Sequence, residues 1–122
     1  MKSSPFFKPE EFACKCNYDS CVDALNFMSE QLLDAIFKIR AQVDFPMIVN
    51  SAYRCSKHNK DVGGSRYSYH CKGMAVDIRM TNPHDRYELV EQAINHGLTV
   101  IIYPTFVHLD CRKGQPLLAL GK

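Results

Sequence analysis

The sequence lacks a long hydrophobic run and a strong charge of either sign. Its longest apolar run spans residues 98–103, whereas a membrane-spanning helix needs about 20 such residues. The formal net charge is +2, from 15 basic and 13 acidic side chains, which is too small for a strong polyanion binder. We therefore expect no membrane insertion and no nucleic acid partner, and we expect a monomer.

The first residues also lack the apolar segment of a secretory signal peptide. Residues 1–7 read Met-Lys-Ser-Ser-Pro-Phe-Phe, which is too short and too polar to form one. This predicts synthesis in a cytoplasm, with any action elsewhere following a later release.

Cysteine is sparse for a disulfide scaffold. Six of 122 residues are cysteine, or about 5%, against the roughly 8–10% that marks such scaffolds. The six are Cys14, Cys16 and Cys21, which lie together, and the scattered Cys55, Cys71 and Cys111. The N-terminal group supplies three thiolates, one fewer than a closed zinc site uses. A second metal, disulfides and free thiols are all open interpretations.

What the sequence does contain is typical of one globular domain, with 46% hydrophobic and 23% charged residues. We treat residues 1–122 as a single domain with an irregular segment at 1–19. Apolar residues at intervals of three and four predict a helix over 20–43, capped by Ser20. Asn82, Pro83 and Gly97 predict a second helix over 83–96.

Short β-rich runs separate and follow these helices. Strands are expected at 47–49, 75–79, 99–103 and 106–111, and the last two runs predict an antiparallel hairpin. A short helix is expected at 57–62. The fold class is therefore α+β: a small domain with two main helices packed on a short, mostly antiparallel sheet.

Three residues carry the chemistry that a metal site needs. His70 and Asp77 are seven positions apart, and Gly73 between them predicts a turn that folds the His70 loop back onto the strand of Asp77. His108 lies in the last β-rich run. Two imidazoles and one carboxylate suit catalytic zinc, because they leave one coordination position open.

Several motifs occur in one order along the chain. They are Ser51-Ala52-Tyr53-Arg54, Lys57-His58-Asn59, Val62-Gly63-Gly64, Ser68-x-His70-x-x-Gly73-x-Ala75-x-Asp77 and Phe106-Val107-His108-Leu109-Asp110. Together they resemble the zinc D-Ala-D-Ala carboxypeptidase and L,D-endopeptidase family. That family includes vancomycin-resistance dipeptidases and phage endolysins, with the hedgehog signalling domain as a distant fold relative. The resemblance implies that His70, Asp77 and His108 bind Zn²⁺.

The resemblance also assigns roles to Arg54 and Ser68. It implies that Arg54 faces the scissile carbonyl or a substrate carboxylate, which suits a guanidinium fork; the alternative is a surface ion pair. It implies that Ser68 helps to position substrate; the alternative is a serine that holds the His70 turn.

The proton acceptor is where the sequence departs from many relatives. They carry Glu three residues before the last zinc-binding His, or His two residues before it, where this chain has Thr105 and Phe106. Strand alternation places Phe106, His108 and Asp110 on one face. Asp110 therefore accepts a proton from water, orients a metal ligand or has a purely structural role.

We expect a zinc peptidase acting on stem or cross-link peptides of bacterial peptidoglycan, similar to a phage endolysin for a Gram-negative host. Made in the host cytoplasm, it would reach the wall or periplasm after release. The alternatives are a zinc-containing binding module without catalysis, or a thiol-rich virion structural protein.

Overall fold

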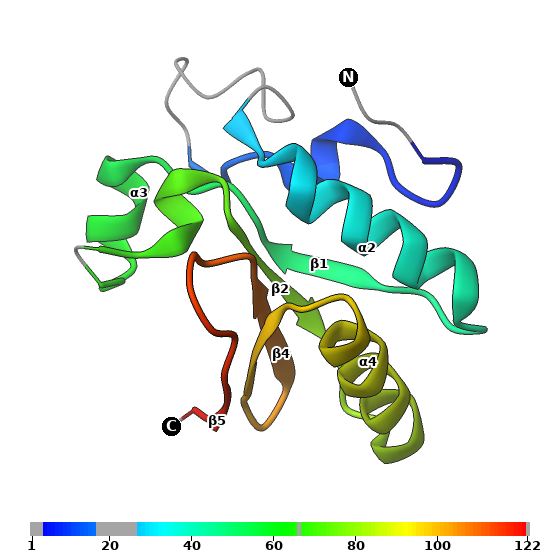
Figure 1. Cartoon of the computed structure of the whole chain (residues 1–122). Coiled ribbons are helices and arrows are strands. Elements are labelled where there is room, and N and C mark those ends of the chain that lie inside the picture. The colour runs from blue at the N-terminus through cyan, green and yellow to red at the C-terminus, as the bar shows by residue number, and fades with distance from the viewer. Residues whose placement is uncertain (1–3, 17–26, 66, 122) are drawn as a thin grey trace.

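One mixed sheet of five short strands forms the centre of the computed structural model (Figure 1). The structure describes residues 4–16, 27–65 and 67–121. Within these ranges the chain runs through η1 (Pro9–Phe12), α2 (Glu30–Gln42), β1 (Ile48–Ser51), α3 (Ser56–Asp61), η3 (Tyr69–Lys72), β2 (Ala75–Arg79), α4 (Pro83–Asn95), β3 (Thr99–Ile102), β4 (Phe106–Asp110) and β5 (Leu118–Leu120). The α+β class is confirmed.

The strands lie in the order β1-β2-β4-β3-β5. The first four pair antiparallel, and β5 pairs parallel with β3. The predicted hairpin is confirmed, because β3 and β4 are direct neighbours with Ile102 opposite Val107. Strand β5 was not predicted, since three residues are too few to display a periodic pattern.

The first long helix begins later than its apolar stripe indicates. The prediction of one continuous helix over 20–43 is wrong at Ser29, which is extended (φ −60°, ψ 128°) and caps α2. Its hydroxyl accepts a hydrogen bond from the Leu32 amide, and its own N–H donates to the Gly73 carbonyl at 2.8 Å. Because that N–H bonds to another element, it is not available to a helix running through Ser29. The predicted cap, Ser20, lies outside the described residues.

The second long helix and the short one follow their predictions closely. Helix α4 begins at Pro83, and the Asn82 side chain accepts hydrogen bonds from the amides of His84 and Asp85. Helix α3 is capped by Cys55. No helix in the described residues has the length and apolar character needed to cross a membrane.

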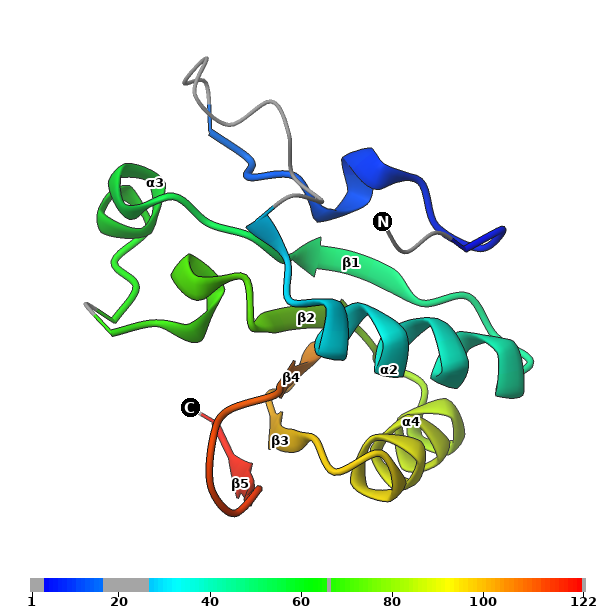
Figure 2. The ribbon, with the colours of Figure 1, turned by 45° about the horizontal axis from the view of Figure 1, so that its top comes forward.

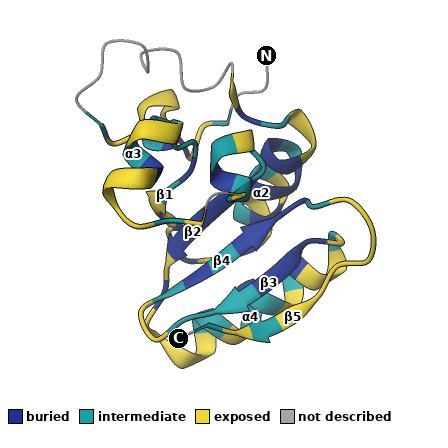
Figure 3. Cartoon of the chain, turned by 90° about the vertical axis from the view of Figure 1, so that its left-hand side faces the viewer, coloured by how far each residue is buried: buried dark blue, intermediate teal, exposed yellow. Residues whose placement is uncertain are grey.

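Helices α2 and α4 pack on one face of the sheet (Figures 1 and 2). The strand residues on that face are fully buried in the core: Val76, Ile78, Val100, Val107 and Leu109. Figure 3 looks onto the opposite face, which has α3 at its edge. Because side chains alternate along a strand, Asp77 and His108 point to this opposite face.

Candidate metal centre

Asp77 and His108 lie opposite each other on neighbouring strands. In the β2–β4 register Asp77 is the partner of His108, and Ala75 is the partner of Asp110. Residues directly opposite on antiparallel strands have their side chains on one face, about 5 Å apart. The sheet therefore brings together a carboxylate and an imidazole that are 31 positions apart in sequence.

His70 reaches the same point from η3, the single turn before β2. Ser68 begins this turn, and its hydroxyl accepts a hydrogen bond from the His70 amide at 3.2 Å. Gly73 ends it in the left-handed conformation (φ +69°) and donates its N–H to the His70 carbonyl. This is the turn that the spacing predicted. This hydrogen bond agrees with the turn-holding interpretation of Ser68, and its part in positioning substrate stays a prediction.

Three ligand-type atoms converge at this point. Asp77 Oδ1 lies 3.2 Å from His70 Nε2 and 2.9 Å from His108 Nδ1. All three atoms lie within 4.8 Å of one another. The His70 side chain is 5% exposed, and those of Asp77 and His108 are 12% exposed. The structure thus brings together the three residues predicted to bind metal, at a position that is largely shielded from solvent.

The far nitrogen of each imidazole has its own partner. His70 Nδ1 lies 2.8 Å from the Ala52 carbonyl oxygen, and His108 Nε2 lies 2.8 Å from Asp110 Oδ2. Both partners are acceptors, so each of these nitrogens carries a proton. When the inner nitrogens, His70 Nε2 and His108 Nδ1, carry no proton, their lone pairs point at the Asp77 carboxylate. Three lone pairs that face one another repel, and a cation bound between them would relieve this repulsion. Nitrogen and oxygen donors of this kind suit zinc.

Asp110 is enclosed on the other side of the His108 ring. Its Oδ1 accepts hydrogen bonds from the Arg112 amide and Nε, and its Oδ2 accepts from Arg112 Nη2 at 2.6 Å and from His108. These four bonds fill the four lone-pair positions of a carboxylate. The residue is fully buried. Because its lone-pair positions are filled, Asp110 is better placed to orient the His108 ring than to accept a proton from water.

These contacts set the charges of the group. Burial raises the pKa of Asp77, but hydrogen bonds from His108 and His70 outweigh burial and lower the pKa to about 2. Burial likewise lowers the pKa of His108, yet its hydrogen bonds to Asp110 and Asp77 raise that pKa to about 9. A proton on His108 Nδ1 sits where a metal ion would bind, so metal binding at this nitrogen releases a proton.

Arg54 is held beside the group by neutral oxygens. Its Nη1 donates to Asn59 Oδ1 at 2.9 Å, and its Nη2 donates to Ser51 Oγ at 3.2 Å. Ser51 is the β1 partner of Asp77. The Arg54 amide also donates to the His70 carbonyl at 3.1 Å. These bonds fix the guanidinium next to the strand that carries Asp77.

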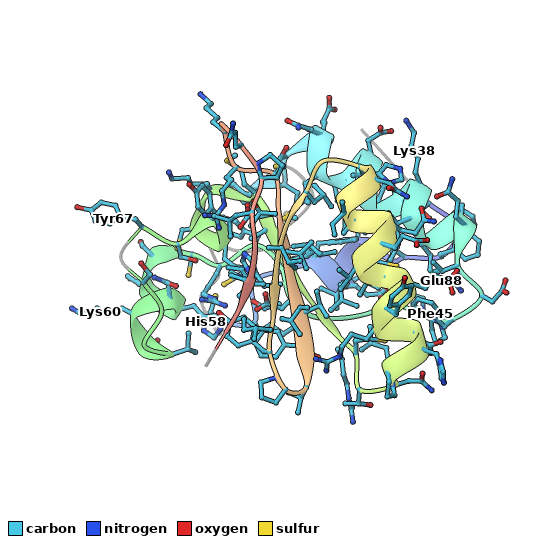
Figure 4. All side chains as sticks on the ribbon, turned by 60° about the horizontal axis from the view of Figure 1, so that its bottom comes forward. Lys38, Phe45, His58, Lys60, Tyr67 and Glu88 are labelled. Carbon is cyan, nitrogen blue, oxygen red and sulfur yellow. The ribbon has the colours of Figure 1, made fainter. Side chains whose placement is uncertain are left out.

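Helix α3 and the loop that follows it border this part of the molecule. Asn59 in α3 donates from Nδ2 to the Ser65 carbonyl at 2.8 Å and so ties the loop to the helix. In Figure 4 the labelled residues of this region, His58, Lys60 and Tyr67, lie on the side away from the long helices. Tyr67 is 75% exposed. The loop that Asn59 ties to α3 thus carries an exposed aromatic side chain.

Arg112 and Cys55 are the residues that the sequence patterns did not single out. Arg112 holds Asp110 and also lies over the Tyr69 ring, 4.7 Å from its centroid. Cys55 joins Cys14 and Cys16 in a second group of potential ligands. Cys21, which the spacing grouped with them, lies outside the described residues. None of the five described cysteines forms a disulfide.

A buried His-Asp-His group beside an anchored arginine has the donor set that could hold a metal ion and the charge that could stabilise an oxyanion. Comparison with known families agrees: residues 5–110, most of the chain, match the family described as Peptidase M15. The chain belongs to this family of zinc peptidases, so the resemblance stated above is confirmed. No curated protein matches the chain.

Proposed function

We propose that this chain is a zinc metallopeptidase that hydrolyses a peptide bond in bacterial peptidoglycan. The observation that carries the proposal is the convergence of His70 Nε2, Asp77 Oδ1 and His108 Nδ1, with both outer ring nitrogens already bonded. Three protein ligands leave a fourth position for water or substrate. When bound, zinc polarises the peptide carbonyl and lowers the pKa of water to about 7.

The chain's own residues prepare this site in distinct ways. Asp77 supplies the negative charge among the three ligands. The Ala52 carbonyl and Asp110 each hold a proton on the outer nitrogen of His70 and His108, so that the inner nitrogen is the one that can bind metal, as second partners of metal-binding histidines do. We therefore assign Asp110 as a positioning residue that acts through His108, held in turn by Arg112.

Arg54 is assigned to the substrate. Two hydrogen bonds to neutral oxygens orient its guanidinium and leave its positive charge uncancelled by those partners. The charge is therefore available to the oxyanion that develops at the scissile carbonyl, or to a substrate carboxylate.

The proposed substrate and place of action follow from the family resemblance. The peptide is a stem or cross-link peptide containing a D-amino acid, cut by carboxypeptidase or endopeptidase action. The protein acts as a monomeric phage endolysin, made in the host cytoplasm and released to the wall.

Digestion of peptidoglycan tests this function. Zinc-loaded protein is incubated with walls of several bacterial types, and new peptide ends are identified by mass spectrometry. We expect cleavage that a chelator stops and zinc restores, and the product masses name the bond. If zinc-loaded protein cleaves none of the walls, the peptidase proposal fails and the binding module takes its place.

The role of Arg54 is tested by Arg54→Lys. Lysine keeps the charge but cannot bond Asn59 and Ser51 in the same fork. We expect kcat to fall about 10²- to 10³-fold, as when one oxyanion donor is removed, with the zinc content unchanged. Arg79→Lys is the control, because Arg79 is exposed at the end of β2. A rise in KM with unchanged kcat would instead assign Arg54 to a substrate carboxylate.

A further inference from the structure

Three cysteine sulfurs meet at a second place, away from the His-Asp-His group. Cys14 and Cys16 follow η1, and Cys55 precedes α3. Cys55 Sγ lies 3.6 Å from Cys14 Sγ and 3.9 Å from Cys16 Sγ. All three sulfurs lie within 4.8 Å of one another. The fold thus gathers thiols from segments 41 positions apart.

These separations match those of ligands around one tetrahedral ion. With zinc–sulfur bonds of about 2.3 Å, tetrahedral geometry places neighbouring sulfurs about 3.8 Å apart. A disulfide requires a sulfur–sulfur distance of about 2.05 Å and uses two of the three thiols. The arrangement therefore suits shared coordination by three thiolates, which leaves one of the four tetrahedral positions for a further donor.

Backbone amides already point at two of the sulfurs. The Cys55 N–H donates to Cys14 Sγ at 3.3 Å, and the His58 N–H donates to Cys55 Sγ at 3.4 Å. Cys14 is 7% exposed. Amide donors and burial stabilise and orient thiolates that bind a metal, and they limit its exchange with solvent.

We propose that Cys14, Cys16 and Cys55 bind a second zinc ion, which has a structural role and joins the N-terminal segment to the segment between β1 and α3. This site is independent of the peptidase proposal, because it shares no ligand with the first.

The joined segment leads directly to the first site. The Tyr53 amide donates to the Phe12 carbonyl at 3.3 Å, and the Ala52 carbonyl accepts from His70. Arg54 lies between these residues and Cys55. A zinc ion on the three thiols therefore fixes the chain that orients both His70 and Arg54.

Zinc stoichiometry measured by elemental analysis tests the proposal. Protein is purified under reducing conditions, loaded with Zn²⁺ and freed of excess. We expect two zinc ions per chain in the wild type, one in Cys16→Ser and one in His108→Ala. Cys111→Ser is the matched control and keeps two, since the Ser29 hydroxyl and the Met74 carbonyl beside Cys111 accommodate a hydroxyl.

The outcomes separate the two sites. A wild type with one zinc that Cys16→Ser retains and His108→Ala loses would overturn the thiol site alone. A wild type with one zinc that Cys16→Ser loses would support the thiol site and refute the first. If Cys16→Ser does not fold, the wild type is loaded with Co²⁺ instead. Thiolate ligation of Co²⁺ gives a sulfur-to-cobalt charge-transfer band. Absence of that band, or an intact mass lower by two hydrogen atoms that marks a disulfide between these cysteines, would also overturn the proposal.

Discussion

We expect Asp77→Asn to abolish zinc binding at the His-Asp-His group and to lower peptide hydrolysis about 10³-fold or more. The substitution keeps the shape of the side chain but removes the negative charge that lies within 3.2 Å of both imidazoles. A bound metal supplies several kcal/mol of transition-state stabilisation, and about 4 kcal/mol corresponds to a factor of 10³ in rate. The measurements are zinc affinity by competition with a chromogenic chelator, and turnover with a peptidoglycan fragment.

Asp110→Asn is the matched variant, because it removes a buried charge from the same face without touching a proposed ligand atom. We expect zinc affinity to fall about 10- to 100-fold, as when an outer partner of a metal ligand is changed. Turnover should largely return at saturating zinc. Circular dichroism checks that both variants fold.

The pair of variants separates two roles for Asp110. A proton acceptor would instead show unchanged zinc affinity and a turnover that stays about 10²- to 10⁴-fold low at saturating zinc. Wild-type zinc affinity in Asp77→Asn would refute the ligand assignment itself.

Local periodicity accounts for much of this site. Alternation along residues 106–111 predicts that His108 and Asp110 share a face, and the two side chains are indeed in contact at 2.8 Å. The spacing around Gly73 predicts the turn that presents His70. Both inferences succeed because the pleat of a strand and the left-handed conformation of glycine are properties of a few consecutive residues.

Local sequence patterns could not predict the contacts between segments that are distant in sequence. Nothing local to Cys55 indicates that it meets Cys14, since the meeting depends on where η1 packs against β1. Arg112 lies beyond the end of β4, where no periodic pattern indicates that its side chain turns back to bind Asp110. Serine is a good cap wherever it stands in sequence; the hydrogen bond from the Ser29 N–H to the Gly73 carbonyl, formed only in the folded protein, accompanies the start of α2 after Ser29.

We expect Gly73→Ala to destabilise the protein by about 2–5 kcal/mol. A left-handed conformation costs a residue with a Cβ about 1–2 kcal/mol. The added carbon would also lie 1.7 Å from the Phe27 carbonyl oxygen, and crowding of this kind typically costs about 1–3 kcal/mol. Because the clash is with backbone, no rotamer change relieves it. This loss is a large fraction of the typical free energy of unfolding of a protein, about 5–15 kcal/mol.

Thermal unfolding with chelator present measures the loss without a contribution from bound metal. At roughly 4 °C per kcal/mol for a chain of this size, Tm should fall by about 8–20 °C. Gly97→Ala is the control, because Gly97 has φ +74° with nothing within 4 Å of the added carbon. It bears the conformational cost alone, so the difference between the two variants isolates the clash with Phe27. Equal losses would mean that the chain before α2 moves aside freely, and Gly73 would then act on His70 only through its backbone conformation.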